Sequence, residues 1–421
     1  MQELYDLQRF SIKMGLENIR ALCDFLGNPQ ERFPAIHIAG TNGKGSTAIM
    51  IQQILEHHGL RTGLYTSPHL VVFNERIRIG DRLIGDAEMV KFWRRIRALV
   101  LERKATFFDA TTALAFQYFA DQKVDAAVIE TGLGGRLDST NILSPRAVVL
   151  TPIDRDHEKQ LGREYAGIAR EKAAIIKSGA IVFSARQRPE TGVVFEPHRG
   201  RPEGYVSVPE QVRLADIRAD GAGMRFSLTD TGRREEFSGL RLTLDGAYQA
   251  DNAALAYLCA RWYLESAGRP FSEAHLRRAL ASVRWPGRLQ KVAENPDVIF
   301  DVSHNEAGIE ATIQYAAARY PDQDRHLLLG LLADKDFSRI VPMVGRFFSR
   351  VVVTEPVSPR KMAAADLQAV FRSQGIAVEA VPEIDAAYAR AAKELTGNDV
   401  LFVMGSHFLI GELLKTIGKR T

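Results

Sequence analysis

The stretch from His37 to Met50, HIAGTNGKGSTAIM, constrains the fold more than any other part of the chain. A short apolar run, Ala35–Ala39, precedes three closely spaced glycines, and a helical pattern follows from Ser46 to about His58. Strand, glycine loop and helix in this order predict a phosphate-binding loop, because backbone N–H groups at a helix N-terminus attract anions. In the common form the hydroxyl residue directly follows the lysine, whereas here Gly45 separates Lys44 from Ser46. The loop alone leaves open an impaired nucleotide site, a chance run of glycines or a loop built for a different reaction.

Further apolar runs with the length of buried strands follow this loop. They cover Ala126–Glu130, Ala147–Thr151 and Ala180–Ser184, and helical patterns separate them. Strands that alternate with helices predict a parallel, doubly wound sheet. Upstream of the loop, apolar residues at helical spacing from Leu4 to Leu26 predict a helix that stops at Gly27.

The character of the chain changes from about Gln187 to Arg241. This stretch is rich in glycine, proline, arginine and glutamate and contains short alternating pieces such as Met224–Leu228. Such a pattern predicts β-hairpins and loops that decorate the first domain. A helix is expected afterwards, from about Tyr248 to Leu264.

A regular second unit begins after Trp285-Pro286-Gly287-Arg288. Its strand-like runs alternate with helical segments and cover 298–303, 326–332, 350–355, 377–382 and 400–405. They predict a Rossmann-like domain, although a G-x-G-x-x-G turn is absent from it. We therefore expect an α/β protein of two domains. A P-loop-containing, doubly wound N-terminal domain covers 1–288, with a β-rich insertion near 187–241, and a smaller Rossmann-like α/β domain covers 289–421.

The composition argues against several classes of protein. A net charge of +4 over 421 residues gives no case for nucleic-acid binding. No apolar run approaches the roughly 20 residues of a membrane span, and the first residues lack the apolar core of a signal peptide. The two cysteines, Cys23 and Cys259, lie in apolar helical patterns and are expected to be buried thiols. We expect a cytoplasmic monomer that binds neither nucleic acid nor membrane.

Several polar residues follow the predicted strands closely enough to carry chemistry. Lys44 can reach the β- and γ-phosphates of a nucleotide, and the Ser46 hydroxyl can bind magnesium. Glu130 ends a buried strand, at the edge of a parallel sheet where ligands bind, and can hold magnesium across from the loop. His157 lies beside carboxylates just past another strand and is a candidate metal ligand, although a lone histidine is more often an ordinary hydrogen-bonded residue.

Two further stretches give weaker signals when taken alone. The run from Arg170 to Lys177 has the alternation of charge and apolar face of an ordinary amphipathic helix. The run from Asp301 to Asn305 ends the first strand of the second domain, where a ribose or substrate contact is expected.

Taken in order along the chain, these motifs resemble the folylpolyglutamate synthase/dihydrofolate synthase family within the Mur-type ATP-dependent amide ligases. The loop of that family reads G-T-N-G-K-G-[ST], so the resemblance implies that the shifted hydroxyl is the ligase form of the phosphate loop and that the site is intact. The other matching runs are Ser67-Pro68-His69-Leu70, Asn74-Glu75-Arg76-Ile77, Glu130 to Asn141, Asp156-His157, Glu171-Lys172-Ala173, Gln249 with Asn252-Ala253-Ala254, Pro286-Gly287-Arg288, Asp301 with His304-Asn305, and Asp334-Lys335-Asp336.

The resemblance implies roles for individual residues. ATP contacts are implied for Gly40, Thr41, Asn42, Gly43, Lys44, Gly45, Ser46, Asn252, Arg288 and Asp301. Ligands of two Mg²⁺ ions are implied at Ser46, Ser67, Glu130 and His157, and Lys44, Glu130, His157 and a carbamylated Lys172 are implied as the catalytic set. Pteroate or folate contacts are implied at Phe108, Asp109, Thr111, Leu137, Asp138 and Ser139, and the glutamate side or the C-terminal site at His304 and Asn305.

The implied reaction joins L-glutamate to the carboxylate of dihydropteroate or a reduced folate, with ATP as the phosphoryl donor and an acyl phosphate as the intermediate. Some positions depart from the family pattern, among them Asp109 where glutamate is expected and Tyr248 where histidine is common. These departures bear on substrate preference. Two alternatives stay open: another Mur-type amino-acid ligase, such as a cell-wall ligase, and a P-loop nucleotide switch that performs no ligation.

Overall fold

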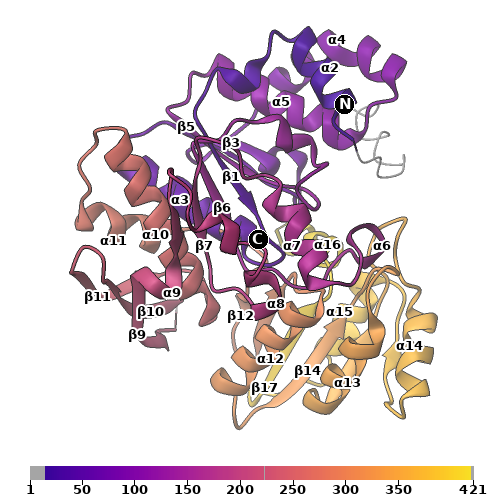
Figure 1. Cartoon of the computed structure of the whole chain (residues 1–421). Helices are drawn as coiled ribbons and strands as arrows, with labels where there is room; N and C mark the ends of the chain where they lie inside the picture. Colours follow the sequence, from indigo (N-terminus) through magenta and orange to yellow (C-terminus); the bar gives the residue numbers. More distant parts are fainter. Residues whose placement is uncertain (1–14, 222, 419–421) are drawn as a thin grey trace.

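The computed structural model describes residues 15–221 and 223–418. Figure 1 shows two sheets, each covered by helices, with a third, smaller sheet beside the first. The part of the predicted N-terminal helix that lies before residue 15 falls outside the described residues. Its end is confirmed by α2 (Glu17–Phe25), which stops just before Gly27.

The first sheet is the one that carries the glycine loop. Its eight strands lie in the order β4-β3-β2-β5-β1-β6-β7-β8. Pairing is parallel except at the β2–β3 and β3–β4 contacts, so the predicted doubly wound sheet is confirmed, with an antiparallel edge that the sequence did not reveal. The strands are β1 (Ala35–Ala39), β2 (Thr62–Tyr65), β3 (Ile77–Ile79), β4 (Arg82–Leu83), β5 (Ala126–Glu130), β6 (Ala147–Leu150), β7 (Ile181–Ser184) and β8 (Tyr205–Ser207).

Helices cover both faces of this sheet because side chains on successive strand residues point to opposite faces. Ile36 and Ile38 pack with α3 and α10, whereas Ala35 packs with α2, α4 and α5 on the other face. Cys23 and Cys259 are buried free thiols, as predicted. The helices are α3 (Lys44–His57), α4 (Asp86–Arg103), α5 (Phe107–Asp121), α6 (Glu158–Leu161), α7 (Tyr165–Ala173), α8 (Pro189–Gly192), α9 (Val208–Gln211), α10 (Tyr248–Ser266) and α11 (Glu273–Ser282).

The predicted β-rich insertion contains an antiparallel sheet of β9 (Val212–Ala219), β10 (Met224–Asp230) and β11 (Glu235–Leu242). Its character differs from the expected decoration in two ways. Apolar side chains of β10 and β11, such as Phe226 and Leu240, are buried in the same core as α3 and α10. Moreover, β8 lies within 187–241 and extends the first sheet instead. The insertion is therefore part of the first core.

The second sheet has six strands in the order β12-β13-β17-β14-β15-β16, and only β12 pairs antiparallel. It confirms the predicted Rossmann-like unit. The strands are β12 (Gln290–Ala293), β13 (Asp297–Asp301), β14 (Asp324–Leu329), β15 (Arg350–Val353), β16 (Glu379–Ala380) and β17 (Asp399–Met404), and the helices are α12 (Glu306–Arg319), α13 (Phe337–Phe347), α14 (Ala364–Ser373), α15 (Ile384–Ala392) and α16 (His407–Gly418). We call residues 290–418 the C-terminal part and the residues before them the N-terminal part.

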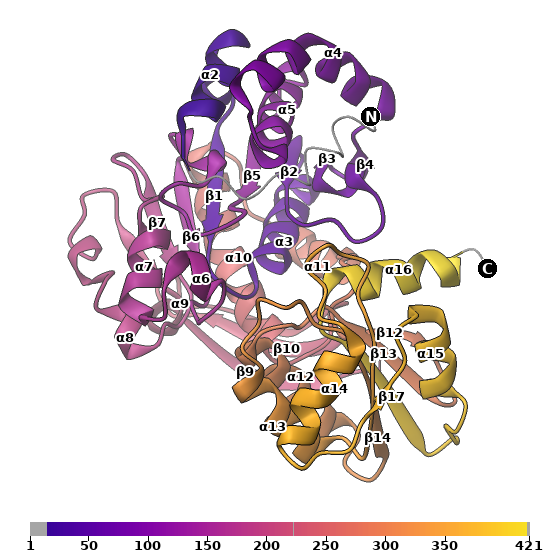
Figure 2. The ribbon, with the colours of Figure 1, turned by 90° about the vertical axis from the view of Figure 1, so that its right-hand side faces the viewer.

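The two parts touch along one boundary, on which α16 lies (Figure 2). Gly411 of α16 packs so closely on the loop after β2 that an added Cβ would lie 2.0 Å from the Leu70 carbonyl oxygen. Within the described ranges, no helix combines the length and apolar character needed to cross a bilayer.

Candidate active site

The glycine loop lies between β1 and α3, at the centre of the first sheet. Gly43 adopts a left-handed φ of 85° at the start of α3, and no side chain caps the helix there. The first N–H groups of α3 are therefore available to an anion. Gly40 has a φ of 155°, and a Cβ at this position would lie 1.8 Å from Thr151 Oγ1. Only glycine fits this close approach to the neighbouring strand.

Two side chains of the loop have the placement expected for a phosphate site. Lys44 Nζ donates to the carbonyl oxygens of Gly40 and Thr41, at 3.2 and 3.1 Å, and thus folds back over the loop. Ser46 is buried, and its hydroxyl accepts one long hydrogen bond of 3.4 Å from Gln249 Nε2. Asn252 donates to Gln249 and lies against Gly43, where a Cβ would meet the Asn252 oxygen at 2.6 Å. The predicted Asn252 thus lies at the loop.

Lys172 lies beneath the same loop. It is buried at the end of α7, and its Nζ donates to the Gly40 carbonyl oxygen at 2.7 Å. Burial, followed by the charge of Lys44, lowers the pKa of Lys172 to about 7, against the opposing influence of Asp156 and Asp138. An amine with this pKa is about half uncharged at pH 7 and largely uncharged above pH 8, and its uncharged form is nucleophilic. The ordinary amphipathic helix expected from composition thus carries a perturbed, buried amine.

Glu130 reaches the loop from the next strand. It ends β5, whose parallel register places it opposite Ile38 of β1. The carboxylate is buried and accepts a hydrogen bond of 3.2 Å from the Ser67 backbone N–H, its single hydrogen bond among the described residues. Burial raises its pKa, while Lys44, the Ser67 N–H, Arg288 and Arg76 oppose that rise. Ser67 and Glu130 are therefore together, as the sequence predicts.

Asp156 and His157 follow β6 and face the C-terminal part. His157 has a left-handed φ of 53°, and its Nδ1 is buried without a hydrogen-bond partner in the described structure. Burial lowers its pKa to about 4, with Asp156 opposing that effect. A neutral imidazole with an unused nitrogen is the form that ligates metals.

The Asp156 carboxylate is surrounded by donors from the C-terminal part. Lys335 Nζ lies 2.7 Å from Oδ1, and Asn305 Nδ2 and His304 Nε2 lie 3.2 and 3.4 Å from Oδ2. Burial alone would raise the pKa of Asp156, but the hydrogen bond from His304 and the charges of His304, His157 and Lys335 hold it well below its usual range. Asn305 also pairs with Asn42 of the glycine loop.

The predicted nucleotide contacts of the C-terminal side divide into two kinds. Arg288 is half-buried and makes no hydrogen bond or ion pair with the described residues, so its guanidinium remains available to a ligand. The Asp301 carboxylate is instead occupied: Oδ2 accepts from the Leu289 N–H at 2.8 Å, and Oδ1 accepts from the N–H and hydroxyl of Ser303. Asp301 thus fixes the backbone on both sides of the strand end.

The predicted pteroate or folate side lies around the start of α5 and the loop after β5. Phe108 packs against that loop, since a Cβ on Gly132 would lie 2.5 Å from the ring. Asp109 caps α5 through Thr106 and accepts from the Ser139 hydroxyl at 2.7 Å. Thr111 is buried and donates to the Phe108 carbonyl oxygen.

Asp138 is buried in the same region and accepts from the Leu133 N–H at 2.7 Å and from Thr140. Burial raises its pKa, and these hydrogen bonds oppose the rise. Leu137, its neighbour, is half-buried. The structure thus brings this group together, but the carboxylates of Asp109 and Asp138 are engaged by protein groups. Both assignments stay predictions.

Sequence reasoning assigned no role to three residues that the structure places in this site: Asp156, Lys335 and Gln249. Each lies in a motif run that carried the resemblance, so a signal was present. The sequence did not reveal which residues these side chains contact. Asp156, for example, binds Lys335, which lies 179 positions away in the sequence.

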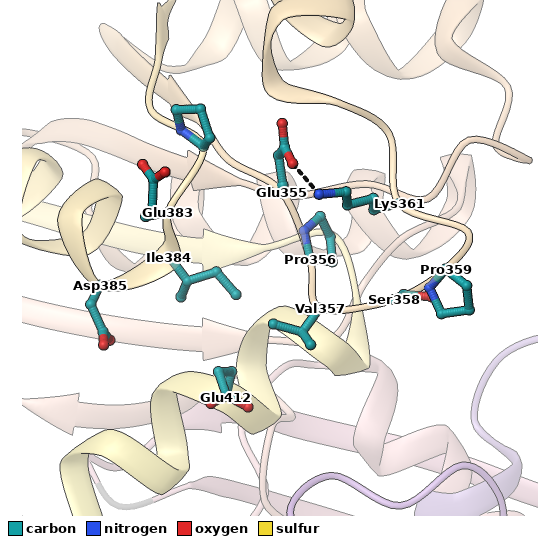
Figure 3. Close-up of a pocket in the computed structure, with 11 residues that line it drawn as sticks. Glu355, Pro356, Val357, Ser358, Pro359, Lys361, Glu383, Ile384, Asp385 and Glu412 are labelled. Carbon is teal, nitrogen blue, oxygen red and sulfur yellow. Dashed lines mark hydrogen bonds and ion pairs between the residues drawn. The ribbon is translucent and has the colours of Figure 1, made fainter. Parts of the chain in front are cut away.

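A hollow elsewhere on the surface, lined by 355–359, Lys361, 382–385 and Glu412, includes none of the predicted site residues (Figure 3). Its acidic rim is partly neutralised, since Glu355 pairs with Lys361 and Glu412 with Lys415.

Comparison with known proteins supports membership of the family that these motifs resemble. Residues 38–260 match the Mur ligase middle domain, and residues 287–407 match the domain described as Mur ligase, glutamate ligase domain. The chain is 37% identical to folylpolyglutamate synthase of Lacticaseibacillus casei over 366 residues, covering 85% of both chains. It is 32% identical to dihydrofolate synthase/folylpolyglutamate synthase of Bacillus subtilis over 419 residues, covering 97% of this chain and 96% of the relative.

Solved structures agree with this result. Mycobacterium tuberculosis folylpolyglutamate synthase complexed with ADP superimposes with a TM-score of 0.90 and 32% identity, over 99% of this chain and 98% of that one. Escherichia coli FolC in complex with DHPP and ADP gives a TM-score of 0.87 and 27% identity, over 100% and 97% of the two chains. With the loop, Glu130 and Lys172 assembled as described, the chain belongs to the folylpolyglutamate synthase/dihydrofolate synthase family of Mur ligases.

Proposed function

We propose that this protein is an ATP-dependent ligase that joins L-glutamate to the carboxylate of dihydropteroate or a reduced folate and releases ADP and phosphate. The observation that carries the site assignment is Lys172 Nζ, 2.7 Å from the carbonyl oxygen of Gly40, in a loop whose other lysine, Lys44, lies over the same backbone. A simple nucleotide switch has no need of a buried amine with a lowered pKa under its phosphate loop.

The reaction proceeds by two displacements. A carboxylate oxygen of the acceptor attacks the γ-phosphorus of ATP, the bond to the β,γ-bridging oxygen breaks, and ADP and an acyl phosphate form. The glutamate nitrogen then attacks the acyl carbon, the carbon–oxygen bond to phosphate breaks, and the nitrogen loses a proton. Lys44, Arg288 and the N–H groups at the start of α3 offset the charge that develops on the phosphoryl oxygens.

Two Mg²⁺ ions and a carbamate are part of this proposal. Ser46, Ser67, Glu130 and His157 are the residues that would hold Mg²⁺, and the ions would neutralise phosphate charge. The fit rests on the buried Glu130 carboxylate with one hydrogen bond and on the unpartnered His157 Nδ1. Among the described residues no three His, Cys, Asp or Glu side chains form a metal cluster. Mg²⁺ tolerates this, because it keeps several waters and shares substrate phosphates.

Carbamylation of Lys172 is supported by its pKa of about 7, because the neutral amine attacks CO₂ and releases a proton as the carbamate forms. The division of the chain into domains at 288/289 is likewise proposed, and it agrees with the second sheet beginning at Gln290. Monomeric state and cytoplasmic location stay predictions.

The test is phosphate release from Mg-ATP with L-glutamate and either dihydropteroate or tetrahydrofolate as the acceptor. Release with both acceptors is expected of a bifunctional synthase, and release with one acceptor identifies the branch. Binding of ATP without release in either mixture would overturn the proposed activity.

A further inference from the structure

Polar side chains of the C-terminal part form hydrogen bonds and ion pairs with two loops of the N-terminal part. Asp156 lies between Lys335, His304 and Asn305, and Asn42 of the glycine loop exchanges two amide hydrogen bonds with Asn305, at 3.0 and 3.3 Å. Asn305 Oδ1 also accepts from the Gly308 N–H and so caps α12. These contacts come from the loop between β13 and α12 and from the loop before α13, and they reach the two loops that carry the phosphate site and His157.

Asp156 connects these contacts to His157. Its Oδ1 accepts from the His157 backbone N–H at 2.8 Å and also receives Lys335 Nζ at 2.7 Å. His157 needs such support, because a residue other than glycine pays a conformational cost at its φ of 53°. The Lys335 and Asp156 side chains are only 6% and 11% exposed, so losing either partner leaves a largely desolvated charge unpaired.

We propose that Lys335 and Asp156 are positioning residues of the ligation reaction: Lys335, carried by the C-terminal part, holds Asp156 and through it His157, so that the site is complete only when the two parts are docked. The proposal rests on the proposed function. Its advantage is chemical, since an acyl phosphate formed in a docked site is shielded from water until glutamate arrives. Both side chains are already paired with protein groups, and the role we assign to the pair is therefore to hold His157 in place.

The first experiment is a double-mutant cycle with Lys335→Met, Asp156→Asn and the double variant. Each single change is expected to lower kcat about tenfold to hundredfold and to raise the phosphate released per glutamate incorporated above one. The kcat of the double variant is expected to lie within about threefold of the kcat of the less active single variant, because both changes remove the same contact. Lys361→Met is the control, because Lys361 pairs with Glu355, a residue of the same part.

Two kinetic outcomes would overturn the proposal. One is additivity of the two single effects. The other is a glutamate KM that rises with Lys335→Met while Asp156→Asn leaves it unchanged, because Lys335 would then contact the substrate directly.

A second measurement needs no turnover. Small-angle scattering of the wild-type chain with AMPPCP, an ATP analogue, reports the separation of the two parts. Both single variants are expected to show a larger radius of gyration than the wild type and the Lys361→Met control. Equal radii in all four proteins would overturn the proposal. An inactive wild type with this scattering difference would instead count against the proposed function alone.

Discussion

Replacing Lys172 by methionine is expected to stabilise the fold while abolishing ligation. Methionine keeps the length of the buried stem but removes an amine whose charged form is disfavoured by burial. The pKa of Lys172 is about 7 in the folded protein against an ordinary value of 10.5, and at 1.36 kcal/mol for each pH unit the difference amounts to about 5 kcal/mol. The methionine variant also loses the hydrogen bond to the Gly40 carbonyl oxygen, which reduces the expected stabilisation by about 1 kcal/mol.

The sign of this effect depends on pH. Below pH 7 both folded and unfolded chains hold the proton, so the folded state bears the whole cost of the buried charge. Between pH 7 and 10.5 the unfolded chain binds more protons than the folded chain, and stability rises with pH. The methionine variant lacks this gain. Its stability advantage over the wild type is therefore expected to shrink by about 3 kcal/mol between pH 6 and pH 9.

The assay is urea unfolding of both proteins in CO₂-depleted buffer, followed by circular dichroism at pH 6, 7.5 and 9. Comparing the two proteins at each pH cancels the titration of the groups that do not interact with Lys172. A variant less stable than the wild type at pH 6, or an advantage that does not change with pH, would refute the assignment of Lys172 as a buried amine of lowered pKa.

Three further predictions concern the loop and the acceptor side. Lys44→Met is expected to lower kcat by about 10²-fold or more, because it removes charge from the phosphate site; an unchanged rate would contradict the assigned role. Gly40→Ala is expected to destabilise the fold by about 2 kcal/mol or more in urea unfolding, since its Cβ would lie 1.8 Å from Thr151 Oγ1, whereas Gly200→Ala, with no atom within 4 Å, serves as the neutral control. Phe108→Ala is expected to raise the KM of the pteroate or folate acceptor about tenfold while leaving that of ATP unchanged, and equal effects on both would indicate a structural role.

The elements that sequence reasoning predicted well are those whose signal is local. The long apolar strands and the glycine loop follow from the residues themselves, since burial on both sides of a parallel strand requires a continuous apolar run. The short strands β3 and β4 were missed because three and two residues are too few to show a pattern. The three-stranded sheet was expected to be peripheral because its polar residues concealed the half that enters the core.

The candidate site shows the same limit. Glu130 and Ser46 were predictable because strand ends and loop spacing locate them along the chain. The state of Lys172 was not, because its helix shows only ordinary amphipathic spacing, and its lowered pKa arises from burial under a loop 132 positions away. The ligand contacts of Asp301 and Asp109 were predicted from the family resemblance. The structure shows that their carboxylate oxygens already accept hydrogen bonds from protein groups.

The order of the two sheets along the chain has a consequence for how the protein is made. The loop after β1, Glu130 at the end of β5 and Asp156 after β6 are all translated before the first residue of the second sheet, because β12 begins at Gln290. Domains generally fold as units as they leave the ribosome, N-terminal end first. The nascent chain therefore passes through a stage at which its anion loop has formed while Lys335 has yet to be added. Nucleotide that binds at that stage contacts a glycine loop that lacks its partners from the C-terminal part. The site becomes complete only after the second sheet has been made and has folded.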